Sequence, residues 1–133
     1  MASTGRGHRA VEIDGFEVLV GKGARENDAL TFGVAEPRDF WLHVAGGTAG
    51  SHVVVRNPEG LAELPRDVLR RAAQLAAWHS KARAAGGKVE VHVCRAADVS
   101  KRRGAPAGEV VLRRWDSIRV YPEPAGGEDA EEG

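Results

Sequence analysis

The sequence predicts an α+β fold in which one long helix packs across a largely antiparallel sheet. Short runs that alternate apolar and polar residues occur at 11–22, 39–56 and 89–94, and a period of two is typical of half-buried strands. Residues 65–84 instead carry small and apolar residues at helical spacing. A chain of 133 residues is long enough for a single domain with its own core.

The first expected element is a tight hairpin over residues 11–22, because Asp14-Gly15 is a turn signal between two short β-rich runs. Residues 25–32 fit a short helix and an irregular turn equally well. A second hairpin follows at 39–56, with a glycine-rich tip at 45–50. The ends, 1–10 and 122–133, are polar, rich in Gly and Pro or acidic, so we expect them to be disordered around a domain at 11–121.

The long helix should begin at Pro65 and end near Ala84, before Gly86-Gly87. Its sheet-facing stripe would consist of Leu69, Ala72, Ala73, Ala76 and Ser80. Three further strands are expected at 89–94, 109–113 and 117–121. Trp115, between the last two strands, is expected to pack in the core.

The hairpin at 39–56 says most about function. In antiparallel pairing, His43 can lie opposite His52, Trp41 opposite Val54 and Asp39 opposite Arg56. The alternate positions are apolar and form the other face: Phe40, Leu42, Val44, Val53 and Val55. Because the polar face combines an acid, an indole, two imidazoles and a guanidinium, we expect it to be exposed and to form a site.

This stretch resembles the signature of a known family. Asp39, Trp41-Leu42-His43 and Gly50-Ser51-His52-Val53-Val54-Val55-Arg56 are similar to the NFACT-R domain, the RNA-binding domain of the NFACT proteins. That family includes eukaryotic and bacterial ribosome quality-control factors and fibronectin-binding-like proteins. Similar motifs continue over roughly residues 12–121, among them Asn27-Asp28-x-Leu30-Thr31, Ser80-Lys81-x-Arg83 and Gly104-Ala105-x-x-Gly108-x-Val110. The resemblance implies a stand-alone module that binds tRNA or rRNA in translation or ribosome quality control, with the ribosome as an expected partner.

The resemblance and the residue chemistry together predict an RNA-binding set. Glycines at the hairpin tip would leave backbone N–H groups open to phosphate, and a basic loop at 101–104 would follow the RNA backbone. If the two hairpin histidines act while charged, RNA affinity should rise as the pH falls through about 6.5. The predicted RNA-binding residues are Trp41, His43, Gly50, Ser51, His52, Arg56, Lys81, Lys101, Arg102 and Arg103.

Charge is segregated along the chain although the formal net charge is zero. From Arg66 to Arg119 there are 13 Lys or Arg against 5 Asp or Glu, a local net charge of +8. Residues 128–132 hold four acids and no base. A basic half of this kind is compatible with a polyanionic partner, and the acidic tail could dock a protein partner.

Other interpretations of the hairpin remain open. Asp39, His43 and His52, with Arg56 for phosphate, could catalyse RNA processing or modification, since two facing histidines can serve as acid and base. Alternatively the set is structural: the two histidines hydrogen-bond to each other and Asp39 pairs with Arg56. A protein-interaction adaptor that works through the acidic tail is a third class.

We expect no metal and no cofactor, because the His and Cys residues lack tight ligand spacing. Cys94 alternates with valines and should be a buried, unreactive side chain. A single Cys fits a reducing compartment, and no apolar run reaches the length of a membrane span. These features lead us to expect a cytoplasmic protein.

Overall fold

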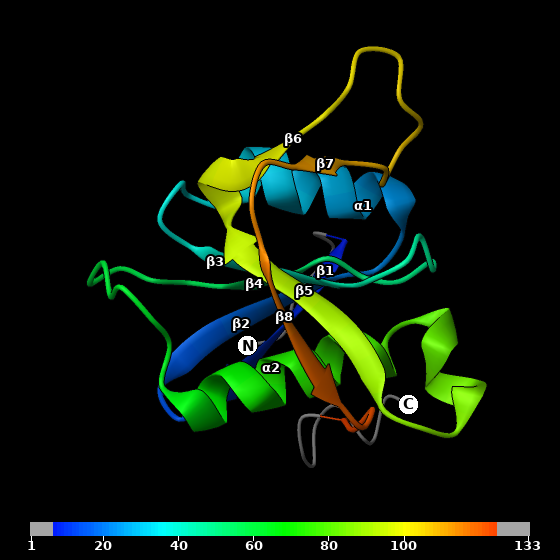
Figure 1. Cartoon of the computed structure of the whole chain (residues 1–133). Coiled ribbons are helices and arrows are strands. Elements are labelled where there is room, and N and C mark those ends of the chain that lie inside the picture. The colour runs from blue at the N-terminus through cyan, green and yellow to red at the C-terminus, as the bar shows by residue number, and fades with distance from the viewer. Residues whose placement is uncertain (1–6, 125–133) are drawn as a thin grey trace.

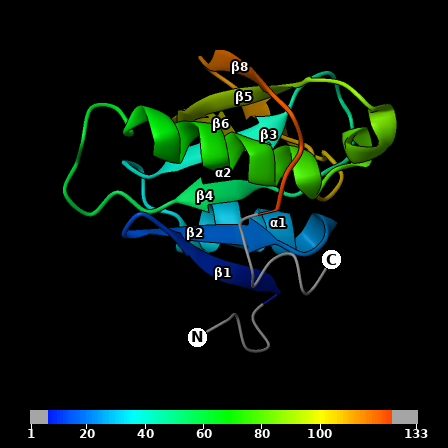
Figure 2. The same cartoon turned by 90° about the horizontal axis from the view of Figure 1, so that it is seen from below.

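The computed structural model describes residues 7–124, and its core is an antiparallel sheet with helices on both faces (Figures 1 and 2). Within the described residues this sheet has six strands in the order β1-β2-β4-β3-β5-β8. The α+β class predicted from the sequence is therefore confirmed. The strands are β1 (His8–Ile13), β2 (Phe16–Gly21), β3 (Phe40–Val44), β4 (Val53–Val55), β5 (Val89–Arg95) and β8 (Asp116–Val120).

Both expected hairpins are present. Asp14 and Gly15 form the first turn with φ angles of 50° and 88°, which is the left-handed geometry of a tight hairpin turn. In the second hairpin Trp41 pairs with Val54, so the predicted register is confirmed. The first strand begins at His8, earlier than expected. The expected disorder of the ends falls mainly on 1–6 and 125–133, which lie outside the described residues.

Helix α2 (Arg66–Trp78) crosses one face of the sheet, as Figure 2 shows. Ala72, Ala73 and Ala76 are fully buried because small side chains let the helix approach the strands closely. Leu75 is also fully buried, whereas Leu69, predicted for this stripe, is only partly buried. The sheet contributes the apolar face of the second hairpin to this core, with Phe40, Leu42, Val44, Val53 and Val55.

The predicted extension of the helix to Ala84 is wrong. Residues 79–81 pair with the hairpin tip instead: Gly50 and Ser80 form a β-bridge, Ser51 N donates to His79 O at 2.9 Å, and Lys81 N donates to Ala49 O at 2.9 Å. A short 3₁₀ helix, η2 (Lys81–Ala85), then follows. The helix therefore ends because of contacts between residues about 30 positions apart in the chain. The spacing of apolar residues within the helix cannot predict such contacts.

The opposite face of the sheet is covered by α1 (Ala24–Ala29), which continues as the π-helical turn η1 (Leu30–Val34). A short turn, η3 (Ala96–Asp98), and a small ladder of β6 (Val99–Ser100) and β7 (Val111–Leu112) complete this layer. Figure 1 shows α1, β6 and β7 on the side of the sheet away from α2. A second core lies beneath them, formed by Leu19, Leu30, Trp41, Val54, Cys94 and Val99.

The structure corrects three expectations on this side of the sheet. The polar face of the hairpin is not exposed, because Asp39, Trp41 and His52 are all buried. The segment around 109–113 forms only the two-residue strand β7, which pairs with β6 and not with β8. Trp115 follows that short ladder and is 49% exposed, so its predicted place in the core is wrong.

Candidate nucleic-acid interface

A cleft of about 820 Å³ opens where the tip of the β3–β4 hairpin meets three other segments. Residues 22–27 at the start of α1, the turn at 78–83 after α2 and the loop at 106–112 complete its walls. The cleft is rich in rings and cations. Its lining includes four of the five histidines, two of the three tryptophans, three cationic side chains and one carboxylate: His43, His52, His79, His92, Trp41, Trp78, Lys22, Lys81, Arg83 and Glu109.

The hairpin tip brings backbone close to the cleft. Gly46 and Gly47 have positive φ angles of 79° and 74°, and open space surrounds the positions where a Cβ would lie. Gly50 is held for a different reason: a Cβ there would lie 2.7 Å from Cβ of Ser80. The tip and the turn after α2 are thus packed as one unit, and that unit carries Lys81.

His52 forms the floor of the cleft and is completely buried. Trp41 Nε1 donates to Thr31 Oγ1 at 3.0 Å, and the Thr31 hydroxyl lies 2.8 Å from His52 Nδ1. His52 Nε2 lies 3.1 Å from Gly108 O. Since a carbonyl only accepts, Nε2 carries the proton and Nδ1 accepts from Thr31. The resulting chain of hydrogen bonds ties the loop at 106–112 to the hairpin.

Burial, followed by the neighbouring His43, lowers the pKa of His52 to about 4. Burial also lowers the pKa of His43, whose ring is half-buried, 5.9 Å from Trp41 and 5.3 Å from His52 between centroids. The predicted hydrogen bond between the two histidines is absent, because both ring nitrogens of His52 are hydrogen-bonded to other residues, Thr31 and Gly108. His52 is therefore neutral at pH 6.5, and burial makes the His43 ring harder to protonate than a free imidazole, so a rise in RNA affinity that depends on either charge is expected below pH 6.5.

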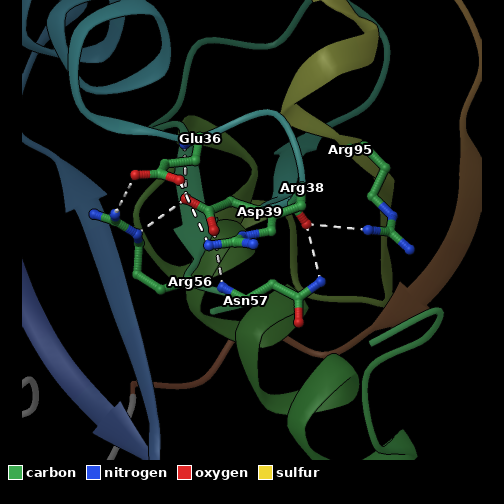
Figure 3. Close-up of polar contacts among 6 residues, drawn as sticks. All are labelled: Glu36, Arg38, Asp39, Arg56, Asn57 and Arg95. Atoms are coloured by element: carbon green, nitrogen blue, oxygen red, sulfur yellow. Dashed lines mark hydrogen bonds and ion pairs between the residues drawn. The ribbon is translucent and has the colours of Figure 1, made fainter. Parts of the chain in front are cut away.

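Asp39 and Arg56 lie in a separate cluster at the other end of the hairpin (Figure 3). The Asp39 carboxylate is 2% exposed and accepts from Glu36 N at 2.9 Å, Asn57 N at 2.8 Å and Arg56 Nε at 2.9 Å. The predicted Asp39–Arg56 ion pair is therefore present. Arg95 extends the cluster by donating to the carbonyls of Arg38, Leu61 and Ala62.

The four residues of the catalytic interpretation do not converge. His43 and His52 line the cleft, whereas Asp39 and Arg56 do not. Four residues of extended strand separate Asp39 from His43, about 13 Å. The contacts of the Asp39 carboxylate hold local structure, so the set divides into a cleft pair, His43 and His52, and a separate Asp39–Arg56 cluster.

In the basic loop between β6 and β7, the contacts of Lys101 differ from those of Arg102 and Arg103. Lys101 Nζ lies 3.1 Å from Asp28 Oδ2 and donates to Pro106 O at 2.7 Å and Glu109 O at 2.9 Å. This side chain therefore closes the loop on itself and onto α1. Arg102 and Arg103 are exposed at the bend, and Figure 1 shows this loop projecting from the body of the domain.

Sequence reasoning missed several residues of the cleft: Lys22, Trp78, Arg83 and His92. The guanidinium of Arg83 lies 4.4 Å from the ring centroid of Trp78, which is cation–π geometry. The motif Ser80-Lys81-x-Arg83 was a signal for Arg83. Lys22 belongs to the family-like motif Val20-Gly21-Lys22, but that motif alone does not show that the fold brings Lys22 to the cleft.

Among residues 7–124, no group of three or more His, Cys, Asp and Glu side chains could hold a metal ion. Cys94 is buried as predicted, and burial raises the pKa of its thiol to about 12. None of the helices described is long and apolar enough to cross a membrane.

Comparisons with known proteins find similarity in sequence and in fold. The family model for the NFACT protein RNA binding domain matches residues 7–114. The chain is 39% identical over 106 residues to the Rqc2 homolog RqcH of Streptococcus suis and 36% identical over 109 residues to that of Bacillus subtilis, covering 79% and 82% of this chain. It spans only 18% of the length of each of these relatives. A solved structure, the C-terminal part of the fibronectin/fibrinogen-binding protein of Streptococcus suis, is 34% identical with a TM-score of 0.78, covering 91% of this chain and 47% of that one.

Proposed function

The chain belongs to the family of NFACT protein RNA binding domains, and from this premise we propose that it binds structured RNA, either tRNA or rRNA, through the cleft at the hairpin tip. Since its relatives are Rqc2 homologs, we place this binding in cytoplasmic ribosome quality control, with the ribosome as a partner. The observation that carries the proposal is the cleft itself, which is lined by residues of three family-like motifs: Trp41-Leu42-His43, Gly50-Ser51-His52 and Ser80-Lys81-x-Arg83.

The charge of the cleft supports a polyanionic ligand. Lys22, Lys81 and Arg83 surround it, against the single carboxylate of Glu109. Such cations gain affinity for nucleic acid by releasing the counterions condensed on phosphates. Arg102 and Arg103, exposed on the neighbouring loop, would extend the contact along the RNA backbone. Lys101 would act indirectly, because it holds that loop in place.

The catalytic interpretation has less support, because Asp39 and Arg56 lie away from the cleft. Trp41 and His52 are completely or almost completely buried, so we assign them a positioning role beneath the RNA. Among the predicted contacts, His43, Lys81 and Gly50 line the cleft and remain our candidates for direct contact. Ser51 also lines it, but its backbone N–H is already donated to His79 O.

The test compares two triple variants of equal charge change. The cleft variant replaces Lys22, Lys81 and Arg83 by Ala; the control replaces Arg66, Lys88 and Arg119, which are exposed and do not line the cleft. Binding to tRNA and to an rRNA fragment is measured by anisotropy from 50 to 300 mM salt.

We expect the cleft variant to lose at least tenfold in affinity at low salt and the control to change little. The slope of log affinity against log salt should fall by about 0.7–0.9 for each lost phosphate contact. Equal losses in both variants would contradict a localised site. The ratio of tRNA to rRNA affinity then identifies the preferred RNA.

A further inference from the structure

The cleft has the size and composition of a pocket for a single nucleotide. Its volume of about 820 Å³ lies within the roughly 300–1,000 Å³ of sites that hold one small molecule. Planar rings and small residues dominate its lining, and its larger aliphatic side chains are Val44, Val110 and Leu112. A pocket for an aliphatic ligand would need far more of these. A surface that only follows phosphates would need no rings.

The rings of the cleft form a supported wall. The half-buried His43 ring is backed by Trp41 at an interplanar angle of 26° and by the edge of His52 at 83°. His92 is the register partner of His43 on β5 and lines the same cleft. A planar side chain held in this way offers a base a rigid surface for stacking, at little cost in side-chain entropy.

Another part of the cleft lining is suited to phosphate. The Gly50–Ser80 bridge and its two flanking backbone hydrogen bonds fix the tip against the turn that carries Lys81 and Arg83. Gly46 and Gly47 have open space where a Cβ would lie, so a phosphate can approach the backbone of the tip. The rings, the glycine backbone and the cations therefore line the same cleft. The rings suit the base of a nucleotide, and the backbone and cations suit its phosphate.

From this juxtaposition we propose that the cleft takes one unpaired nucleotide of the RNA, with its base against His43 and its phosphate near the glycine tip, Lys81 and Arg83. The inference rests on the proposed RNA-binding function and specifies its ligand. A base that remains paired inside a stem cannot enter a hollow of this size. The domain therefore recognises a loop, a bulge or a strand end, and not a continuous duplex.

The test uses RNA probes that share one stem: a fully paired duplex, the same duplex with a single bulged nucleotide, and one strand alone. Free nucleoside monophosphate serves as the small-molecule probe. We expect the bulged and single-stranded probes to bind at least tenfold more tightly than the duplex at 150 mM salt. His43→Ala should remove this preference and leave duplex affinity within about twofold. Tyr121→Ala, an exposed ring outside the cleft, should keep the preference.

A second measurement needs no variant. 2-Aminopurine at the bulged position should change its fluorescence on binding, because stacking quenches it, whereas 2-aminopurine inside the stem should not. Equal binding of bulged and paired RNA, or no fluorescence change, would overturn the nucleotide pocket. Competition of free nucleoside monophosphate with the bulged probe, lost in His43→Ala, would support it. Failure to bind any of the RNA probes would instead overturn the proposed function.

Discussion

At the scale of single residues, polar side chains of the hairpin hold the fold together beneath the cleft. His52 is joined to Thr31 and Gly108, residues that are far from it in the sequence. The alternation of the strand correctly placed Trp41, His43 and Asp39 on one face. It could not show that α1, η1 and the 106–112 loop cover most of that face, because their contacts depend on the whole chain.

The first prediction concerns the pH dependence of stability. The folded pKa of His52 is lowered to about 4, so the folded state disfavours its protonation and the unfolded state does not. Its contribution is complete above about pH 6.5 and is lost as the pH falls towards 4, by on the order of 3 kcal/mol. Denaturant unfolding should show wild-type stability falling across this range.

His52→Gln should be less stable at pH 7, because it disturbs the hydrogen bonds to Thr31 and Gly108. Its stability should nevertheless change less than that of the wild type between pH 6.5 and 4. Comparing the two proteins at each pH removes the contribution of the carboxylates they share. Parallel curves would contradict the assignment of this titration to His52.

The second prediction separates the Asp39 cluster from RNA binding. Asp39→Ala leaves two backbone N–H groups and the Arg56 guanidinium without their acceptor. We expect a loss of about 3 kcal/mol in unfolding free energy, with the RNA affinity of the folded protein unchanged. Asp67→Ala is the control, because Asp67 pairs with Arg70 on the exposed surface and should cost less than about 1 kcal/mol. A large loss of RNA affinity at intact stability would place Asp39 in the site.

At the scale of elements, the hairpin tip and the end of α2 determine each other. The sequence correctly predicted the hairpin register and the presence of the helix. It placed the helix end near Ala84, because Lys81, Ala82 and Arg83 fit a helix locally. The structure ends α2 at Trp78, since residues 79–81 satisfy their backbone groups on the tip. A long-range β-bridge therefore sets where a local element stops.

The third prediction tests this coupling with Gly50→Ala. The new methyl group would lie 2.7 Å from Cβ and 3.2 Å from Cα of Ser80, so the bridge must open. We expect a loss of about 1–3 kcal/mol in stability and weaker RNA binding, because Lys81 moves with the turn. Gly87→Ala is the matched control, since nothing lies within 4 Å of its added Cβ. Equal melting temperatures for the two variants would show that the tip and the turn are not coupled.

At the scale of the whole molecule, the two faces of the sheet are covered by different kinds of residue. One face packs on α2 through aliphatic and alanine side chains, a pattern that periodicity predicts well. The other combines a small apolar core with the ring-lined cleft, so hydrophobic periodicity alone does not predict which of its polar residues are buried. Only the assembled sheet brings the histidines at 43, 52, 79 and 92 into one hollow.

The last prediction concerns charge over the full chain. Residues 128–132 hold four acids and lie outside the described residues, while the cleft and the 101–104 loop are basic. A polyanionic segment tethered to the domain competes with RNA for cations, and salt screens that competition. Deleting residues 127–133 should raise RNA affinity several-fold at 50 mM salt and change it little at 300 mM. Replacing the four acids by Gln at unchanged length is the control for chain length and should act like the deletion. Weaker binding after either change would instead favour the tail as a docking element for a protein partner.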